Sequence, residues 1–169
     1  PWPGIARTIW GDHNRYKLTS KIISEIFDYI NKKLKNKGTI LISTSRRTNN
    51  KVIDYINSLK ISYSNIKQIY HPNRQKKNNP VINFLKTCEE VVVTGDSMSM
   101  VSEACELKKP VRIFYNKSIC SPKQINFCKN IINNKYAFTF ETFRIKCKNI
   151  KTLNSSRIVA KEIKKRIIF

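Results

Sequence analysis

Small polar and basic residues gather in three short segments, each of which follows an apolar run. The segments are residues 11–14 (Gly-Asp-His-Asn), 43–48 (Ser-Thr-Ser-Arg-Arg-Thr) and 94–99 (Thr-Gly-Asp-Ser-Met-Ser). Arg46 and Arg47 carry planar guanidinium groups that can donate paired hydrogen bonds to a phosphate. Ser97 and Ser99 add hydroxyl donors. These residue types therefore indicate an anion-binding site, with phosphate as the anion they suit best.

The apolar runs before these segments predict strands, and helical periodicity predicts helices between them. The predicted strands are residues 5–10, 39–43, 66–70, 90–94 and 110–115. The predicted helices are residues 22–34, 52–59, 81–87, 97–107, 119–133 and 154–168. Strands that alternate with helices predict an α/β fold with a Rossmann-like, doubly wound parallel sheet. The run Val91-Val92-Val93 predicts a strand that is buried on both faces.

Local signals refine some of these boundaries. Thr19 or Ser20 is the expected N-cap of the first helix, and Gly38 is expected to end it. Residues 71–80 are polar and bounded by prolines, which predicts a surface loop. Asp96 is the expected N-cap of the helix that begins at Ser97.

In an open parallel sheet, ligands bind beyond the carboxyl ends of the strands. Each polar segment lies at such an end and directly before a helix, whose N-terminal amides and dipole favour an anion. An interpretation without a ligand is also open, because any α/β domain has polar loops at these positions. An anionic cap at Asp96 would also repel a diphosphate. We expect His13 to be the only histidine near a strand end. We interpret it as a loop residue rather than a general base.

The chain has 169 residues and a net charge of +22, with 33 Lys and Arg against 11 Asp and Glu. This length predicts one domain over residues 1–169, with a core at 5–133 and a C-terminal extension and helix at 134–169. The charge could mark a polyanion-binding surface. The basic residues are spread along the chain, however, and Asn and Ile are also abundant. We therefore favour compositional bias with solvated basic faces and do not expect a nucleic-acid partner.

The five cysteines include no CxxC pair, and the chain has two histidines, His13 and His71. This pattern predicts free thiols in a reducing, cytoplasmic compartment, and no metal or cofactor. No apolar run reaches the 18 residues of a membrane span. The chain begins without Met, and we interpret it as a truncated or processed piece.

Three stretches carry a family resemblance: Leu41 to Thr48, Thr94 to Ala104, and Lys109-Pro110-Val111. Together with the tail from Leu153 to Ile163, they resemble the mitochondrial-fission protein family named for elongated plant mitochondria. Bacterial members of that family are often labelled nucleoside-diphosphate-sugar epimerase-like. The resemblance runs from about residue 5 to residue 168. It implies the second, donor-binding domain of a GT-B glycosyltransferase-like protein, with the first domain absent.

The resemblance implies a nucleoside-diphosphate sugar of UDP type as the ligand. Ser97 and Ser99 would then meet the diphosphate, and Glu103 would accept hydrogen bonds from the ribose hydroxyls. Gly11 would let its loop approach the donor, and Arg46 or Arg47 would balance the phosphate charge. The full set of candidate donor-binding residues is Gly11, Ser45, Arg46, Arg47, Gly95, Asp96, Ser97, Ser99 and Glu103.

No catalytic residue is assigned, because GT-B chemistry takes place between two domains. The alternatives are a sugar-nucleotide 2-epimerase, a non-catalytic interaction module and a basic polyanion binder. The last predicted helix carries an apolar stripe of Val159, Ile163 and Ile167. Such a stripe predicts either a homodimer or a docking surface for the missing first domain.

Overall fold

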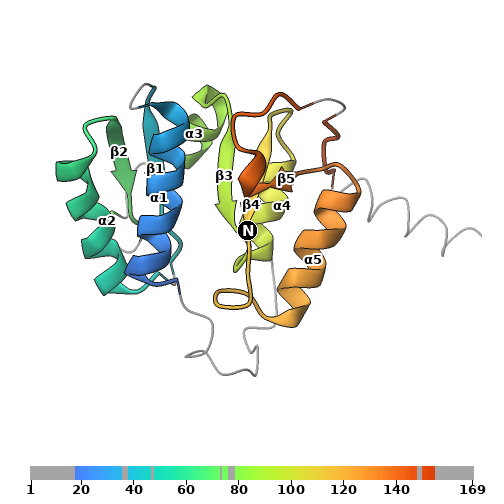
Figure 1. Cartoon of the computed structure of the whole chain (residues 1–169), viewed down its shortest axis with the longest axis horizontal. Helices are drawn as coiled ribbons and strands as arrows, with labels where there is room; N and C mark the ends of the chain where they lie inside the picture. Colours follow the sequence, from blue (N-terminus) through green and yellow to red (C-terminus); the bar gives the residue numbers. More distant parts are fainter. Residues whose placement is uncertain are drawn as a thin grey trace, which may run out of the picture.

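The computed structural model of the chain describes residues 18–35, 38–46, 48–72, 74–75, 79–147 and 150–154. Helices and strands alternate along this part of the chain (Figure 1). In order, the elements are α1 (Ser20–Leu34), β1 (Ile40–Ser43), α2 (Asn50–Ser62), β2 (Ile66–Tyr70), α3 (Val81–Thr87), β3 (Val91–Thr94), α4 (Met98–Cys105), β4 (Val111–Phe114), α5 (Pro122–Asn133), β5 (Phe138–Thr139) and the 3-10 helix η1 (Phe140–Thr142). The predicted α/β class is confirmed.

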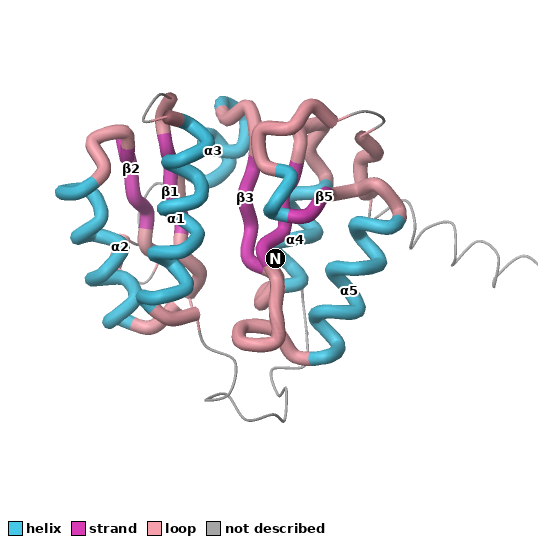
Figure 2. Tube along the Cα trace, in the orientation of Figure 1, coloured by secondary structure: helices cyan, strands magenta, loops and turns pink. Residues whose placement is uncertain are grey.

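The strands form two small parallel sheets within the described residues. One sheet pairs β1 with β2, and the other has the order β3-β4-β5 (Figure 2). The register places Ile42 beside Ile69 in the first sheet and Val93 beside Ile113 in the second. Parallel sheets joined through helices are consistent with a Rossmann-like fold. The strand predicted at residues 5–10 lies outside the described residues, as does the helix predicted at 154–168 except for its first residue, Asn154.

Helix α1 forms because its apolar residues recur at helical spacing and its first turn is capped. Ile22, Ile26 and Ile30 are buried along one stripe. The side chain of Thr19 accepts a hydrogen bond from the Ile22 amide at 3.4 Å, so the predicted N-cap is confirmed. The helix ends at Lys35, which adopts a left-handed conformation with φ 51°. The expectation that Gly38 ends the helix is therefore wrong. Gly38, with φ 90°, instead makes the turn into β1.

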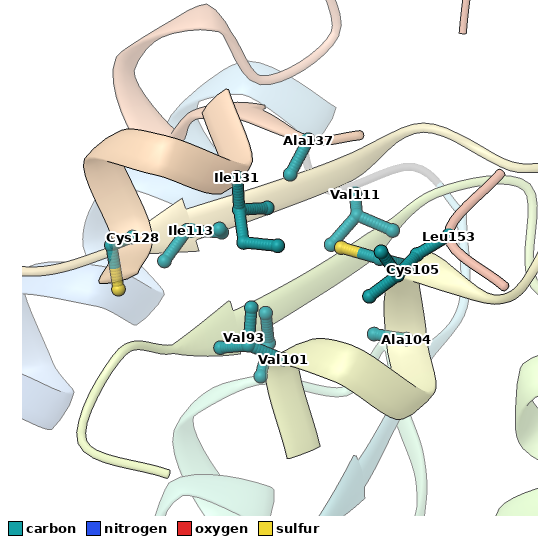
Figure 3. Packing of buried hydrophobic residues seen from close by; sticks show 10 residues of the cluster. All are labelled: Val93, Val101, Ala104, Cys105, Val111, Ile113, Cys128, Ile131, Ala137 and Leu153. Atoms are coloured by element: carbon teal, nitrogen blue, oxygen red, sulfur yellow. The ribbon is translucent and has the colours of Figure 1, made fainter. Parts of the chain in front are cut away.

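The helices cover both faces of the β3-β4-β5 sheet. On one face, Val93 and Ile113 pack against residues of α4 and α5 (Figure 3). On the other face, Val92 and Phe114 pack in a cluster that contains the apolar stripe of α1. A third cluster joins α1 to α2 and to the β1-β2 sheet. Because α1 contributes to two of these clusters, it binds the two sheets into one unit.

Two local predictions differ from the structure. In β3 only Val93 is buried, whereas Val91 and Val92 are half-buried, so this strand is not buried on both faces. Helix α5 begins at Pro122 rather than at residue 119. The reason is a capping box in which Ser121 and Gln124 exchange hydrogen bonds, with a proline at the first helical position, where it is favoured.

The short strand β5 and η1 were not predicted, and a buried arginine holds them in place. Arg112 lies in β4 and forms an ion pair with Glu90. Its other guanidinium nitrogens donate to the Thr142 hydroxyl at 2.6 Å and to the Ile145 carbonyl at 2.7 Å. The guanidinium also lies 5.0 Å from the centre of the Phe138 ring. Charge pairing and hydrogen bonds together make the burial of this arginine possible.

Candidate functional site at the carboxyl edge of the strands

The strands of both sheets end at the lower edge of the molecule in Figure 1, where α1 also begins. This carboxyl edge carries the described members of the predicted donor-binding set. Gly11 and Arg47 lie outside the described residues. Ser45 and Arg46 follow β1, and the remaining candidates follow β3 or lie in α4, namely Gly95, Asp96, Ser97, Ser99 and Glu103.

Ser45 begins a tight turn that presents Arg46. The Ser45 amide donates to the Thr48 hydroxyl oxygen at 3.0 Å, and the two hydroxyl oxygens lie 3.2 Å apart. The Thr48 amide in turn donates to the Ser45 carbonyl at 3.1 Å. The Ser45 amide is therefore already used inside the turn, while the side chain of Arg46 is exposed. Among the described members of this turn, Arg46 is the one best suited to reach an anion.

Gly95 has a packing role at the end of β3. A Cβ atom at this position would lie 2.7 Å from the Cys128 sulfur and 2.8 Å from the Tyr115 Cβ. Its amide donates to the Phe114 carbonyl at 2.9 Å. The close approach that requires glycine here is thus to α5 and β4. The amide of Gly95 extends the sheet ladder and is not directed at a ligand.

Ser97, and not Asp96, is the N-cap of α4. This corrects the expectation by one residue, since the helix begins at Met98. Ser97 is 6% exposed, and its side chain makes no capping hydrogen bond. The Asp96 carbonyl accepts a hydrogen bond from the Gln124 side chain, which ties this turn to the start of α5. The Ser97 side chain therefore does not cap the first-turn amides of α4.

Ser99 and Glu103 lie four residues apart on the exposed side of α4. The opposite side of the helix packs into the core through Val101, Ala104 and Cys105. Residues at this spacing are neighbours on a helix surface. The structure therefore places Ser99 and Glu103 on one accessible face, with Ser99 in the first helical turn.

The helices that begin at this edge bring positive charge to it. The first turns of α1, α2, α4 and α5 contain no acidic residue. Lys21, Lys51 and Lys123 instead occupy the first turns of α1, α2 and α5, and all three are exposed. A helix N-terminus is equivalent to roughly half a positive charge. The dipoles and the lysines thus add to the same field, which favours a bound anion.

One chain of hydrogen bonds at this edge was not predicted from the sequence. The Thr44 hydroxyl oxygen lies 3.0 Å from His71 Nδ1, and His71 Nε2 lies 3.1 Å from the Asn57 side-chain oxygen. Burial is the main cause that lowers the pKa of His71, and the nearby Arg74 lowers it further. His71 directly follows β2. The expectation that His13 is the only histidine near a strand end is therefore wrong, and the predicted end of strand 66–70 was the signal that could have found His71.

The cysteines are all free, as expected. Cys105, Cys120 and Cys128 are buried, and burial raises the pKa of the first two to about 12 and that of the third to about 11. Within the described residues, no three His, Cys, Asp or Glu side chains are grouped closely enough to hold a metal ion. In the same part of the chain, no helix has the length and apolar character needed to cross a membrane.

Comparison with known proteins adds a family match. The model of the family described as Mitochondrial fission ELM1 matches residues 1–167. The curated "Uncharacterized protein RP120" of Rickettsia prowazekii (strain Madrid E) is 31% identical to this chain over 160 residues. That match covers 92% of this chain and 44% of the relative, so the chain spans less than half of the relative's length. No solved structure matches the chain significantly.

Proposed function

Because the chain belongs to the mitochondrial fission ELM1 family, we propose that it is the donor-binding domain of a glycosyltransferase-like protein and binds a nucleoside-diphosphate sugar. The proposed site is the carboxyl edge of the strands. It includes the Arg46 side chain, the first turn of α4 and the exposed face formed by Ser99 and Glu103.

The observation that carries this proposal is the chemistry of the helix N-termini at that edge. They lack acidic residues in their first turns, and the N-cap Ser97 of α4 makes no capping hydrogen bond through its side chain. An anion that accepts hydrogen bonds from the first-turn amides of α4 would satisfy them and interact favourably with the dipole. A diphosphate suits this position, with the hydroxyl of Ser99 and the guanidinium of Arg46 as further donors.

Glu103 supports the choice of a nucleotide over a simple phosphate. A carboxylate one and a half turns into α4 would repel the diphosphate itself, but it can accept two hydrogen bonds from a ribose diol. At a rise of 1.5 Å per residue, Glu103 lies about 9 Å along the helix from Ser97. This separation suits a ligand that extends from the helix N-terminus along α4.

The proposal concerns donor binding and not turnover by this chain alone. The chain spans less than half of its relative's length. Sugar transfer also needs an acceptor, and no described group is assigned to activate one. A separate acceptor-binding part would therefore be required for the reaction.

The test compares a nucleoside-diphosphate sugar with inorganic pyrophosphate. A ligand at about 100 times its Kd stabilises the folded state by about 2.7 kcal/mol, which raises Tm by several degrees. We expect UDP-glucose to raise Tm, and Glu103→Gln to weaken UDP-glucose while leaving pyrophosphate unchanged. Glu106→Gln is the matched control, because Glu106 is also exposed but is the C-cap of α4, three residues further from the helix N-terminus than Glu103. Equal losses for both ligands in Glu103→Gln would remove the ribose role, and no Tm shift with UDP-glucose or pyrophosphate at millimolar concentration would reject the function.

A further inference from the structure

Thr44, His71 and Asn57 join three elements at the carboxyl edge. Thr44 follows β1, His71 follows β2, and Asn57 lies in α2. Thr44 is 7% exposed and His71 is 4% exposed, so water has little access to the bond between them. The Thr44 amide also donates to the Tyr70 carbonyl at 3.0 Å. Both the backbone and the side chain of Thr44 are therefore held, directly before the turn that presents Arg46.

The partners of His71 determine where the protons lie. The Asn57 oxygen can only accept, so in the neutral ring the proton is on Nε2, 3.1 Å from that oxygen. Nδ1 is then bare and accepts the hydrogen bond of the Thr44 hydroxyl across 3.0 Å. The single hydroxyl proton of Thr44 is thus used within the protein, and its oxygen can offer only lone pairs to a ligand.

Protonation of His71 reverses the bond with Thr44. A second proton makes Nδ1 a donor as well, and the Thr44 oxygen must then accept from it. The hydroxyl proton is released from the ring and can point elsewhere. We propose that His71 is a positioning residue whose protonation makes the Thr44 hydroxyl available as a donor to an anion at the carboxyl edge, so that the edge binds its ligand more tightly in acid. This inference rests on the proposed anion site.

The charges around His71 set the range in which the change occurs. Arg74, in the same loop, and burial both lower the pKa of His71, whereas Asp54 of α2 raises it. Arg74 and Asp54 form an ion pair at 2.7 Å. The loop after β1 brings one charged group of the described residues, the exposed Arg46. The pKa of His71 is therefore below the ordinary histidine value of 6.5, so the ring is neutral near pH 7 and becomes protonated in more acidic solution.

The sign of the pH effect follows from linkage. An anion that binds the protonated form more tightly must raise the pKa of His71 by the same free energy. Affinity should therefore increase as the pH falls through the pKa of His71. A hydrogen bond to a charged acceptor is stronger than one between neutral groups, so donation from the released Thr44 hydroxyl to the anion should increase the affinity about tenfold between the neutral and protonated forms of His71.

The experiment uses sulfate and UDP-glucose, because neither changes charge between about pH 5 and pH 8. NMR of the imidazole nitrogens follows His71, whose signal is identified by its loss in His71→Gln. We expect both ligands to raise the pKa of His71 and to bind about tenfold more tightly at the acid end. If both ligands bind but the pKa of His71 does not move, the inference is wrong and the proposed function stands. If neither ligand binds at any pH, both are rejected.

Substitutions at Thr44 and Asn57 separate positioning from a structural role. Thr44→Val removes the hydroxyl with little change of shape, and we expect it to lose most of the pH dependence, which Thr44→Ser should restore. Asn57→Asp places a carboxylate beside Nε2 and should move the pH profile to higher pH. Asn133→Asp makes the same charge change at the far end of α5 and should leave the profile in place. A pH dependence that persists unchanged in Thr44→Val, or a profile that Asn57→Asp does not move, would overturn the inference.

Discussion

Arg112 is the residue whose burial has the clearest energetic consequence. Its side chain is 1% exposed and that of its partner Glu90 is 9% exposed. Removing one member of a buried ion pair leaves an uncompensated charge, which typically costs about 3–5 kcal/mol. We therefore predict that Arg112→Ala lowers the free energy of unfolding by about that amount, measured by urea denaturation.

The control for this substitution is Arg144→Ala. Arg144 pairs with Glu89 at 3.2 Å, but the two side chains are 47% and 86% exposed. Exposed pairs contribute about 0–1 kcal/mol. Equal effects of the two substitutions would contradict the assignment of Arg112 as the residue that holds β5 and η1 against the sheet.

The cysteines give a second prediction at this scale. A thiol reacts with an alkylating reagent as the thiolate, and burial both restricts access and raises the pKa. At pH 8 we expect iodoacetamide to label the half-buried Cys88 and Cys147 in the folded protein. Cys105, Cys120 and Cys128 should react after denaturation only. Mass spectrometry of the digested protein measures which cysteines are labelled. Rapid labelling of Cys120 or Cys128 in the native state would contradict the packing around Gly95.

Some site residues could be predicted from the sequence and others could not. The hydroxyl and guanidinium side chains next to strand ends indicated the carboxyl edge, because parallel strands bring their ends together. Gly95 was predicted as a donor-binding residue from its place at a strand end, and its close packing against Cys128 and Tyr115 was not predicted. The role of Arg112 was not predictable, since its hydrogen-bond partners lie 22 to 33 residues away in sequence.

Among the elements, those with strong local signals were predicted best. The predicted bounds of β2 and α3 match the structure, and the N-cap of α1 is Thr19, one of the two expected residues. The errors occur at the ends of elements, where several weak sequence signals mark the boundary, such as the start of α5 at Pro122. Strand β5 has two residues, too few for any periodicity, and it forms by pairing with β4. Its existence depends on tertiary contacts.

The strand predicted at residues 5–10 lies outside the described residues, and three described amides of β1 and β3 can test whether a further strand pairs with them. Ile40 and Thr44 donate their amides toward β2, and Val91 and Gly95 donate theirs toward β4. Alternation along a strand therefore directs the amides of Ser43, Val92 and Thr94 away from those partners. A further parallel strand beside β1 and β3 would accept hydrogen bonds from these amides.

We therefore predict that these three amides are protected from hydrogen exchange. Their protection should match that of the Ile42 and Val93 amides, which are directed toward the paired strands β2 and β4. Exchange measured by NMR distinguishes the individual amides. If Ser43, Val92 and Thr94 exchange as fast as the amides of exposed loops, then no further strand pairs with these sides of β1 and β3.

For the whole molecule, the net charge of +22 predicts how it behaves toward nucleic acids. Basic residues spread over many faces should attract polyanions without reading sequence. We expect weak binding to duplex DNA and to RNA that falls steeply as the salt concentration rises, measured by fluorescence anisotropy. Tight, sequence-selective binding at physiological salt would instead favour a polyanion-binding function.

The central claim is that the carboxyl edge of the strands is the donor site, and amide NMR mapping with UDP-glucose tests it most directly. We predict that the largest chemical-shift changes occur at Met98, Ser99 and Arg46, with smaller changes at the first turns of α2 and α5. The amides of Ile66 and Val111 lie at the opposite ends of their strands and should not move. Changes that centre on those opposite ends, with none at the first turn of α4, would contradict the proposed site.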